Sequence, residues 1–152
     1  YLYYGGVSGT PTALANWQGG PVRQVSIIHN GLKSIQEIQN EYKKRFNDDW
    51  YTGQTFNGLA LLAGAMAQAK STNPVAVAKA MSGIKVQGFN GEIEMRKLDH
   101  QLQQPVIISE WRKATPQVSY SVENTGFNFQ EVRTLPPFVA STPTSCQMKR
   151  PS

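Results

Sequence analysis

The spacing of apolar residues changes partway along this 152-residue chain, and that change limits the folds open to it. Between about residues 34 and 70, apolar side chains recur every three or four positions, which is the period of amphipathic helices. From about residue 84 they alternate with polar side chains, most clearly over 92–96, which is the period of half-buried strands. Helices that follow short strands and precede a strand-rich half predict an α/β fold.

The expected elements can be placed by their apolar runs and their turn residues. Strands are predicted over 1–4, 22–28, 84–86, 92–96, 106–111 and 129–135, and helices over 10–16, 34–46, 53–70 and from residue 74. Asn73 before Pro74 predicts an N-cap followed by proline in the first helical turn. Helices between the first strands suit parallel pairing, whereas Asn90-Gly91 predicts a tight turn in an appended β-hairpin.

The helices differ in how clearly they define a buried face. Over 34–46, the apolar residues Ile35, Ile38, Tyr42 and Phe46 form one stripe among polar residues. The helix over 53–70 is rich in alanine and glycine, which predicts close packing against neighbouring chain. Its expected buried stripe consists of Phe56, Leu59, Ala63, Met66 and Ala67.

Composition excludes several classes of protein. Lysine and arginine outnumber aspartate and glutamate by 15 to 10, but most are scattered singly, which argues against a nucleic-acid interface. A single cysteine excludes an internal disulfide framework and a cysteine-based zinc site within this chain. No apolar run approaches the length of a membrane span. We expect neither a metal nor a cofactor.

No pattern of catalytic residues is present, so the chain is predicted not to be an enzyme. It lacks the nucleophile elbow G-x-S-x-G, the phosphate-binding P-loop, H-E-x-x-H and G-x-G-x-x-G. The adjacent Asp48 and Asp49 indicate a solvated helix end rather than an acid–base pair. His29 and His100 indicate loop histidines, and a hydrolase or transferase would need a nucleophile beside one of them.

Two segments leave a binding role open. The loop Gly5-Gly6-Val7-Ser8-Gly9 is either a plain turn or a source of backbone N–H groups for an anionic ligand. Tyr51, beside Trp50 at a helix entrance, is either a core residue or a wall of a ligand cleft.

The two ends of the chain indicate a longer polypeptide. The chain starts inside a predicted strand, so we expect it to be the C-terminal part of a larger protein. Cys146 lies in a polar tail and is expected to act as a tether, bonded in an oxidising compartment to a cysteine outside this chain.

Several short motifs, in their order and spacing, resemble the branched-chain amino acid type of periplasmic substrate-binding protein. The motifs are spread along nearly the whole chain, at residues 3–9, 41–46, 58–60, 83–92, 99–101 and 146–151. These proteins are the solute receptors of ABC importers, and the resemblance implies the type I fold of two Rossmann-like lobes joined by three crossovers. It assigns residues 1–30 to the end of the second lobe, 31–113 to the part returning to the first lobe, and 114–152 to the final crossover and tail.

The resemblance also implies a ligand site. Tyr51 matches an aromatic residue that packs on the ligand, and the loop after the first strand faces the cleft. Gly6 stands where the family usually places an acidic residue for the ligand's ammonium group, which is a departure from the family pattern. The implied ligand-binding residues are Tyr4, Gly5, Gly6, Val7, Ser8 and Tyr51.

The implied function is that of a secreted periplasmic receptor, made with a signal peptide. Its two lobes would close on a small amino acid-like ligand, and the closed form would deliver that ligand to an ABC transporter permease. Its expected partners are the ligand, the permease and the missing N-terminal part of the same protein. The alternative is a ligand-sensing regulator of the same fold that binds an amide or another small polar molecule.

Overall fold

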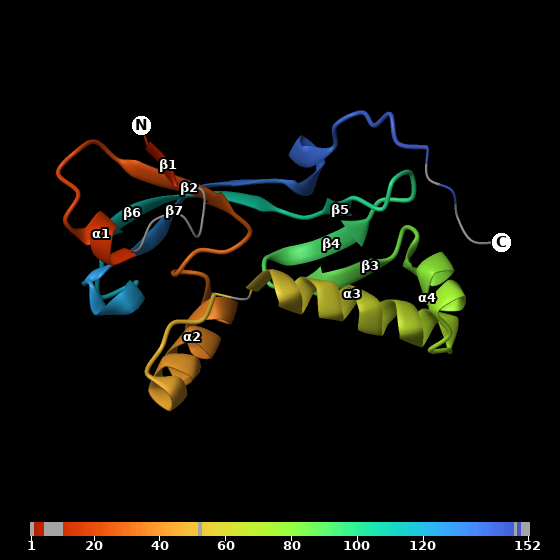
Figure 1. Ribbon diagram of the computed structural model, residues 1–152, viewed down its shortest axis with the longest axis horizontal. Helices are drawn as coiled ribbons and strands as arrows, with labels where there is room; N and C mark the ends of the chain where they lie inside the picture. Colours follow the sequence, from red (N-terminus) through yellow and green to blue (C-terminus); the bar gives the residue numbers. More distant parts are fainter. Residues whose placement is uncertain (1, 5–10, 52, 148, 150–152) are drawn as a thin grey trace. The chain divides into compact units, whose positions relative to one another are not determined.

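The computed structural model describes residues 2–4, 11–51, 53–147 and 149, with residues 2–4, 54 and 140 described by their backbone alone. The first half of the chain is mainly helical with two short strands, and strands dominate the second half (Figure 1). The elements are β1 (Leu2–Tyr4), α1 (Pro11–Ala15), β2 (Val22–Ser26), α2 (Lys33–Phe46), α3 (Gly53–Ala69), α4 (Pro74–Met81), β3 (Lys85–Gly88), β4 (Gly91–Met95), β5 (Leu102–Gln103), β6 (Val106–Lys113), the 3-10 helix η1 (Val122–Asn124), β7 (Phe127–Leu135) and the 3-10 helix η2 (Pro137–Ala140).

The chain folds into two compact units, each made from two separate segments. Unit 1 comprises Tyr1–Tyr51 and Val106–Leu135, and unit 2 comprises Thr52–Pro105 and Pro136–Ser152. The chain therefore passes between the units three times, after Tyr51, Pro105 and Leu135. The predicted division at residues 30 and 113 stays a prediction. The assignment of either unit to a first or second lobe stays a prediction.

Unit 1 contains a four-stranded sheet in the order β1-β2-β6-β7. β1 and β2 pair in parallel, as expected for strands with a helix between them, and β6 is antiparallel to both β2 and β7. The pairing of β6 with β7 shifts register between Ile108 and Ser109. Buried apolar side chains of this unit include Val22, Ile35, Ile107 and Phe129.

Unit 2 contains the antiparallel sheet β3-β4-β5, packed against α3 and α4. Its core is a cluster of buried residues from both helices and the strands, namely Leu61, Ala65, Val77, Ile84 and Ile93. The predicted cap of α4 is confirmed, because the Asn73 side chain accepts hydrogen bonds from the backbone N–H groups of Val75 and Ala76 at 3.0 and 3.1 Å.

The small residues of α3 let it approach the sheet closely, as expected. A Cβ atom at Gly64 would lie 2.8 Å from a methyl group of Val86 and 3.3 Å from one of Ile84. Such distances are shorter than van der Waals contact, so the helix can lie at this depth only because residue 64 has no side chain.

The predicted face of α3 is wrong at most of its positions. The buried residues include Gly53, Asn57, Leu61 and Ala65, whereas Phe56 and Leu59 are 45% and 59% exposed. Of the predicted stripe, Met66 is partly buried against the core. In an Ala-rich helix apolar residues occur all round the axis, so the sequence periodicity does not select one face. The predicted stripe on α2 is fully buried at Ile35 and half-buried at Ile38 and Tyr42, but Phe46 is 58% exposed.

The predicted hairpin is confirmed, but its turn lies one residue earlier. Gly88 pairs with Gly91, so Phe89 and Asn90 form the two-residue connection. Gly91 has a φ of 103°, a left-handed region that favours glycine, at the first position of β4. Among the described residues, no helix combines the length and the hydropathy needed to cross a membrane.

Candidate functional site

Most of the predicted ligand-binding residues cannot be placed. Gly5, Gly6, Val7 and Ser8 lie outside the described residues, and Tyr4 is described only as the last backbone position of β1, opposite Gln24. Tyr51 is the member of the predicted set whose side chain is described. Whether the set forms one site therefore stays a prediction, and Tyr51 is the residue around which the candidate site can be described.

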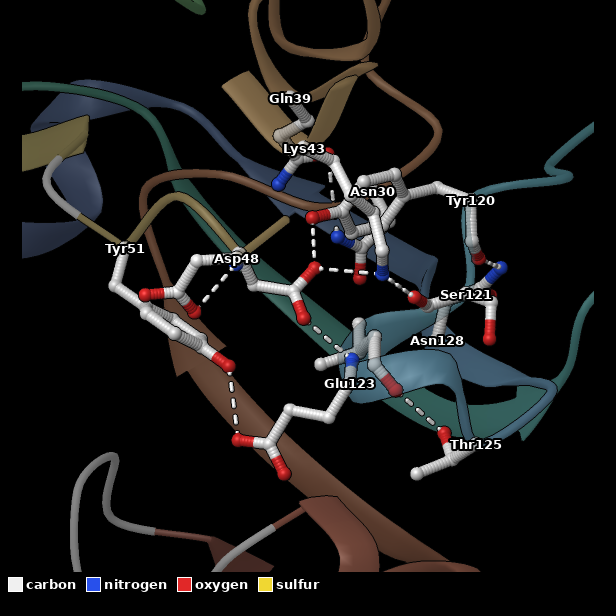
Figure 2. A network of polar contacts seen from close by, with 12 residues as sticks. Asn30, Gln39, Lys43, Asp48, Tyr51, Tyr120, Ser121, Glu123, Thr125 and Asn128 are labelled. Carbon is white, nitrogen blue, oxygen red and sulfur yellow. Dashed lines mark hydrogen bonds and ion pairs between the residues drawn. The ribbon is translucent and has the colours of Figure 1, made fainter. Parts of the chain in front are cut away.

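The side chain of Tyr51 is exposed, and a hydrogen bond from its hydroxyl group fixes its position. The residue is 55% exposed, and its hydroxyl donates a hydrogen bond of 3.0 Å to Oε1 of Glu123 (Figure 2). Partial burial and this hydrogen bond raise the pKa of the phenol above its usual value, so it stays protonated and acts as a donor. Tyr51 is also the last residue of unit 1 before the chain enters unit 2.

The segment that carries Tyr51 is anchored by the buried carboxylate of Asp49. The α2 helix ends at Phe46 and is capped by Asn47, whose backbone is left-handed and whose N–H donates to the Lys43 carbonyl. Lys43 lies in the last turn of this helix, and its amine is 3.1 Å from Oδ1 of Asp49. Lys43 also donates to the backbone carbonyl of Ser121, so it joins α2 to the loop before η1.

Asp49 receives two further hydrogen bonds from that loop. The Tyr120 hydroxyl and the backbone N–H of Glu123 both donate to its carboxylate. Only 6% of Asp49 is exposed, and an unpaired carboxylate at such depth would be strongly unfavourable. Burial and the bond to Asp49 raise the pKa of Tyr120, which keeps its hydroxyl a donor. The three donors account for the burial of Asp49.

Glu123 connects three parts of unit 1. Its carboxylate accepts hydrogen bonds from Tyr51 and, at 3.1 Å, from the Thr12 hydroxyl of α1, while its own N–H binds Asp49. Its backbone is left-handed, with a φ of 47°, and that of Asn124 is left-handed at 57°. A non-glycine residue in this region costs about 1–3 kcal/mol unless its surroundings hold it there. The hydrogen bond from the Glu123 N–H to Asp49 holds Glu123 in this conformation.

A second set of buried amides fixes the same loop to the sheet. Asn30 Oδ1 accepts from the Phe129 N–H at 2.8 Å, and Asn30 Nδ2 donates to Gln39 of α2 at 3.3 Å. Asn128 donates to the carbonyls of Val118 and Tyr120 at 2.8 and 2.6 Å. The network in Figure 2 therefore locks α2, β7 and the 114–126 loop together around Tyr51 and Glu123.

This geometry is suited to holding a surface in place. Asp49 is compensated by Lys43 and bonded by three donors, so the expected solvated helix end is wrong for Asp49, although Asp48 is exposed. His29 is a mostly buried loop histidine whose Nε2 lies 3.5 Å from Glu131. In the described part of the chain, no three histidine, cysteine or acidic side chains gather as a metal site would require.

Sequence reasoning missed Asp49, Glu123 and Tyr120. They lie up to 111 residues from their partners in the chain, so no local spacing connects them. Two features of the sequence could have pointed to this network: the lysine six residues before Asp49, and the tendency of tyrosine to be buried. Neither feature identifies which residues pair.

A profile of the family described as "Periplasmic binding protein" matches residues 14–116 of this chain. The chain belongs to this family. The match spans both units and most of the described elements, so the resemblance drawn from the short motifs is confirmed.

Solved structures share the fold at low identity. A leucine-, isoleucine-, valine-, threonine- and alanine-binding protein from Brucella ovis, in its closed conformation, aligns over 91% of this chain with a TM-score of 0.75 and 22% identity. An ABC-type branched-chain amino acid transporter from Rhodopseudomonas palustris aligns over 83%, with a TM-score of 0.63 and 23% identity. A solute-binding protein from R. palustris BisB5, in complex with 3,4-dihydroxybenzoic acid, aligns over 82%, with a TM-score of 0.61 and 17% identity. No curated protein sequence matches the chain.

These likenesses confirm the α/β, type I periplasmic-binding-protein fold with its appended hairpin, present here as a partial domain. The chain spans 37% of the length of the first of these structures and 34% of each of the others. The family and its structural neighbours are binding proteins rather than enzymes.

Proposed function

We propose that this chain is the C-terminal part of an extracytoplasmic solute-binding receptor that delivers a small ligand to an ABC transporter permease. The observation that carries the proposal is the family match over residues 14–116. The fold shared over 91% of the chain with an amino acid-binding protein supports it. In this proposal the receptor binds and releases its ligand without chemical change, needs no cofactor or metal, and works in the periplasm after secretion.

The proposed site lies opposite a surface that the rest of the polypeptide supplies. Two lobes closing on a ligand give the closed state its higher affinity, so one wall alone would bind weakly. On the present chain the wall comprises Tyr51 and the loop after β1, with Tyr4, Gly5, Gly6, Val7 and Ser8. The fixed hydroxyl and exposed ring of Tyr51 suit packing against a ligand side chain.

The ligand class follows less directly than the receptor role. One neighbouring structure is named for its binding of leucine, isoleucine, valine, threonine and alanine, and another holds 3,4-dihydroxybenzoic acid. We propose that the ligand is a small amino acid-like molecule. Because Gly6 offers no carboxylate for an ammonium group, the test also includes an aromatic acid and an amide. A regulator that senses an amide on the same fold is the alternative.

Calorimetric titration of the full-length protein tests this proposal. The panel should contain leucine, phenylalanine, acetamide and 3,4-dihydroxybenzoate. We expect saturable heat with at least one of the acids, weakened by about tenfold in Tyr51→Ala, because the ring loses its apolar contact with the ligand. Phe46→Ala, which removes an exposed aromatic ring outside the proposed site, serves as the matched control. The absence of heat with all four compounds would overturn the receptor proposal, and heat with acetamide alone would favour the regulator.

A further inference from the structure

The outer face of the β3-β4-β5 sheet in unit 2 carries a hollow of about 390 Å³. The strands contribute charged and polar side chains to it, and the C-terminal segment after β7 forms a wall. Residues that line it include Lys85, Glu92, Glu94, Gln103, Phe138 and Ser141.

Strand register explains why these side chains meet. Lys85 pairs with Glu94, and Glu94 pairs in turn with Gln103, so the three form a row across the sheet. The neighbouring residue Ile93 belongs to the buried core under α3, and side chains alternate between the two faces of a strand. The row therefore lies on the face of the sheet opposite the core.

Gln103 is a buried polar side chain with an unmet hydrogen-bonding group. Only 7% of it is exposed, and its carbonyl oxygen accepts a hydrogen bond from the Ser141 hydroxyl. Its amide nitrogen has no partner among the described residues. A buried N–H donor without an acceptor costs about 1–3 kcal/mol, so an acceptor oxygen entering the hollow would be favoured there.

The charges around the hollow leave it net negative. Lys85 pairs with both Glu92, at 2.9 Å, and Glu94, at 3.6 Å, so one cation faces two carboxylates. Arg96 adds no free charge, because its guanidinium is paired with Asp99 and also donates to the Thr142 carbonyl at 2.9 Å. Phe138, which is 72% exposed, adds an aromatic ring that can accept a cation on its face.

We propose that this hollow is a second binding site, for a small organic cation that carries an acceptor oxygen, such as a primary amine with a carbonyl or amide group. On binding, the buried Gln103 side chain turns so that its amide nitrogen donates to the ligand oxygen. The ligand's ammonium group lies near Glu94 and the ring of Phe138. The site lies within unit 2 and does not include Tyr51 or the loop after β1, so it stands whether or not the proposed receptor function is correct.

The side-chain amide signal of Gln103 in the full-length protein provides the test. This signal is assigned in a ¹⁵N–¹H spectrum by its disappearance in Gln103→Glu, a variant that keeps an oxygen facing Ser141. Glycinamide, which has both an ammonium and an amide oxygen, should shift the signal saturably. Acetamide and methylammonium, which each have one of the two groups, should bind about tenfold more weakly.

Two further variants separate this site from others. Glu94→Gln, which removes one charge without changing the side chain's shape, should weaken glycinamide binding about tenfold, measured by the same signal. Glu37→Gln, the same change on α2 in unit 1, should leave it unaltered. The proposal is overturned if glycinamide leaves the Gln103 signal unmoved, or if Glu94→Gln binds it as tightly as the unmodified protein. Glycinamide bound elsewhere in the protein would give heat without moving this signal.

Discussion

The Asp49 carboxylate holds together three segments of unit 1 at the scale of a single residue. It pairs with Lys43 of α2 and receives donors from Tyr120 and from the backbone of Glu123. Through Glu123 it also sets the position of the Tyr51 hydroxyl. A change at Asp49 should therefore affect both stability and the proposed ligand wall.

We expect Asp49→Asn to lower the free energy of unfolding by about 1–3 kcal/mol, because it leaves Lys43 without its counter-charge. Asp48→Asn, an exposed neighbour with the same chemical change, should stay within about 0.5 kcal/mol of the unmodified protein. Denaturant unfolding of the full-length protein compares the two. Equal losses would contradict the role given to Asp49.

His29 should make stability depend on pH. Burial lowers the pKa of its imidazole, an effect that Glu131 partly offsets. The unfolded chain therefore binds a proton at a higher pH than the folded chain does. Above pH 6.5, the pKa of the unfolded chain, the imidazole does not reduce the free energy of unfolding. As the pH falls from there through the lower pKa of the folded chain, the free energy of unfolding decreases. Denaturant midpoints between pH 5 and 8 should show this fall and lose it in His29→Gln; an unchanged profile in that variant would contradict the assignment.

At the scale of elements, sequence periodicity predicted which segments form helices and strands better than which face each one buries. The ranges of α2, α3 and β6 and the cap at Asn73 follow from local patterns. The buried face of α3 does not, because its alanines and glycines offer no contrast between its sides. The two-residue strand β5 was missed because it is too short to show a period. The Asp49 network depends on pairings between distant segments, which local patterns do not encode.

Two glycines of α3 allow a direct test of its packing. A Cβ atom added at Gly58 would have no described neighbour within 4 Å, whereas one added at Gly64 would lie 2.8 Å from Val86. Gly58→Ala should stabilise the protein by up to about 1 kcal/mol through helix propensity. Gly64→Ala should instead destabilise it, since overpacking typically costs about 1–3 kcal/mol. Thermal unfolding of both variants measures the contrast, and a similar rise in both would contradict the close approach.

At the scale of the whole molecule, the exposed apolar side chains require explanation. On α3, Phe56 and Leu59 are 45% and 59% exposed, and on α2 Phe46 is 58% exposed. Large apolar side chains exposed within one turn of a helix, as at Phe56 and Leu59, are typical of surfaces that another part of a protein covers. Their presence agrees with the proposal that this chain works as one part of a longer polypeptide.

The isolated 152-residue chain should therefore bind a hydrophobic dye and self-associate, whereas the same residues within the full-length protein should not. Dye fluorescence and size-exclusion chromatography of the two proteins test this. A monomeric isolated chain that melts cooperatively and binds no dye would contradict it.

The chain passes between the two units three times, and this has a consequence for its folding during synthesis on the ribosome. The segment Thr52–Pro105 holds α3, α4 and the whole β3-β4-β5 sheet, so this portion can condense while later residues are still being added. β2 must wait much longer, because its neighbour β6 emerges more than 80 residues afterwards. During that interval its edge is open to pairing with other nascent chains, which makes β2 the place where misassembly during translation would begin.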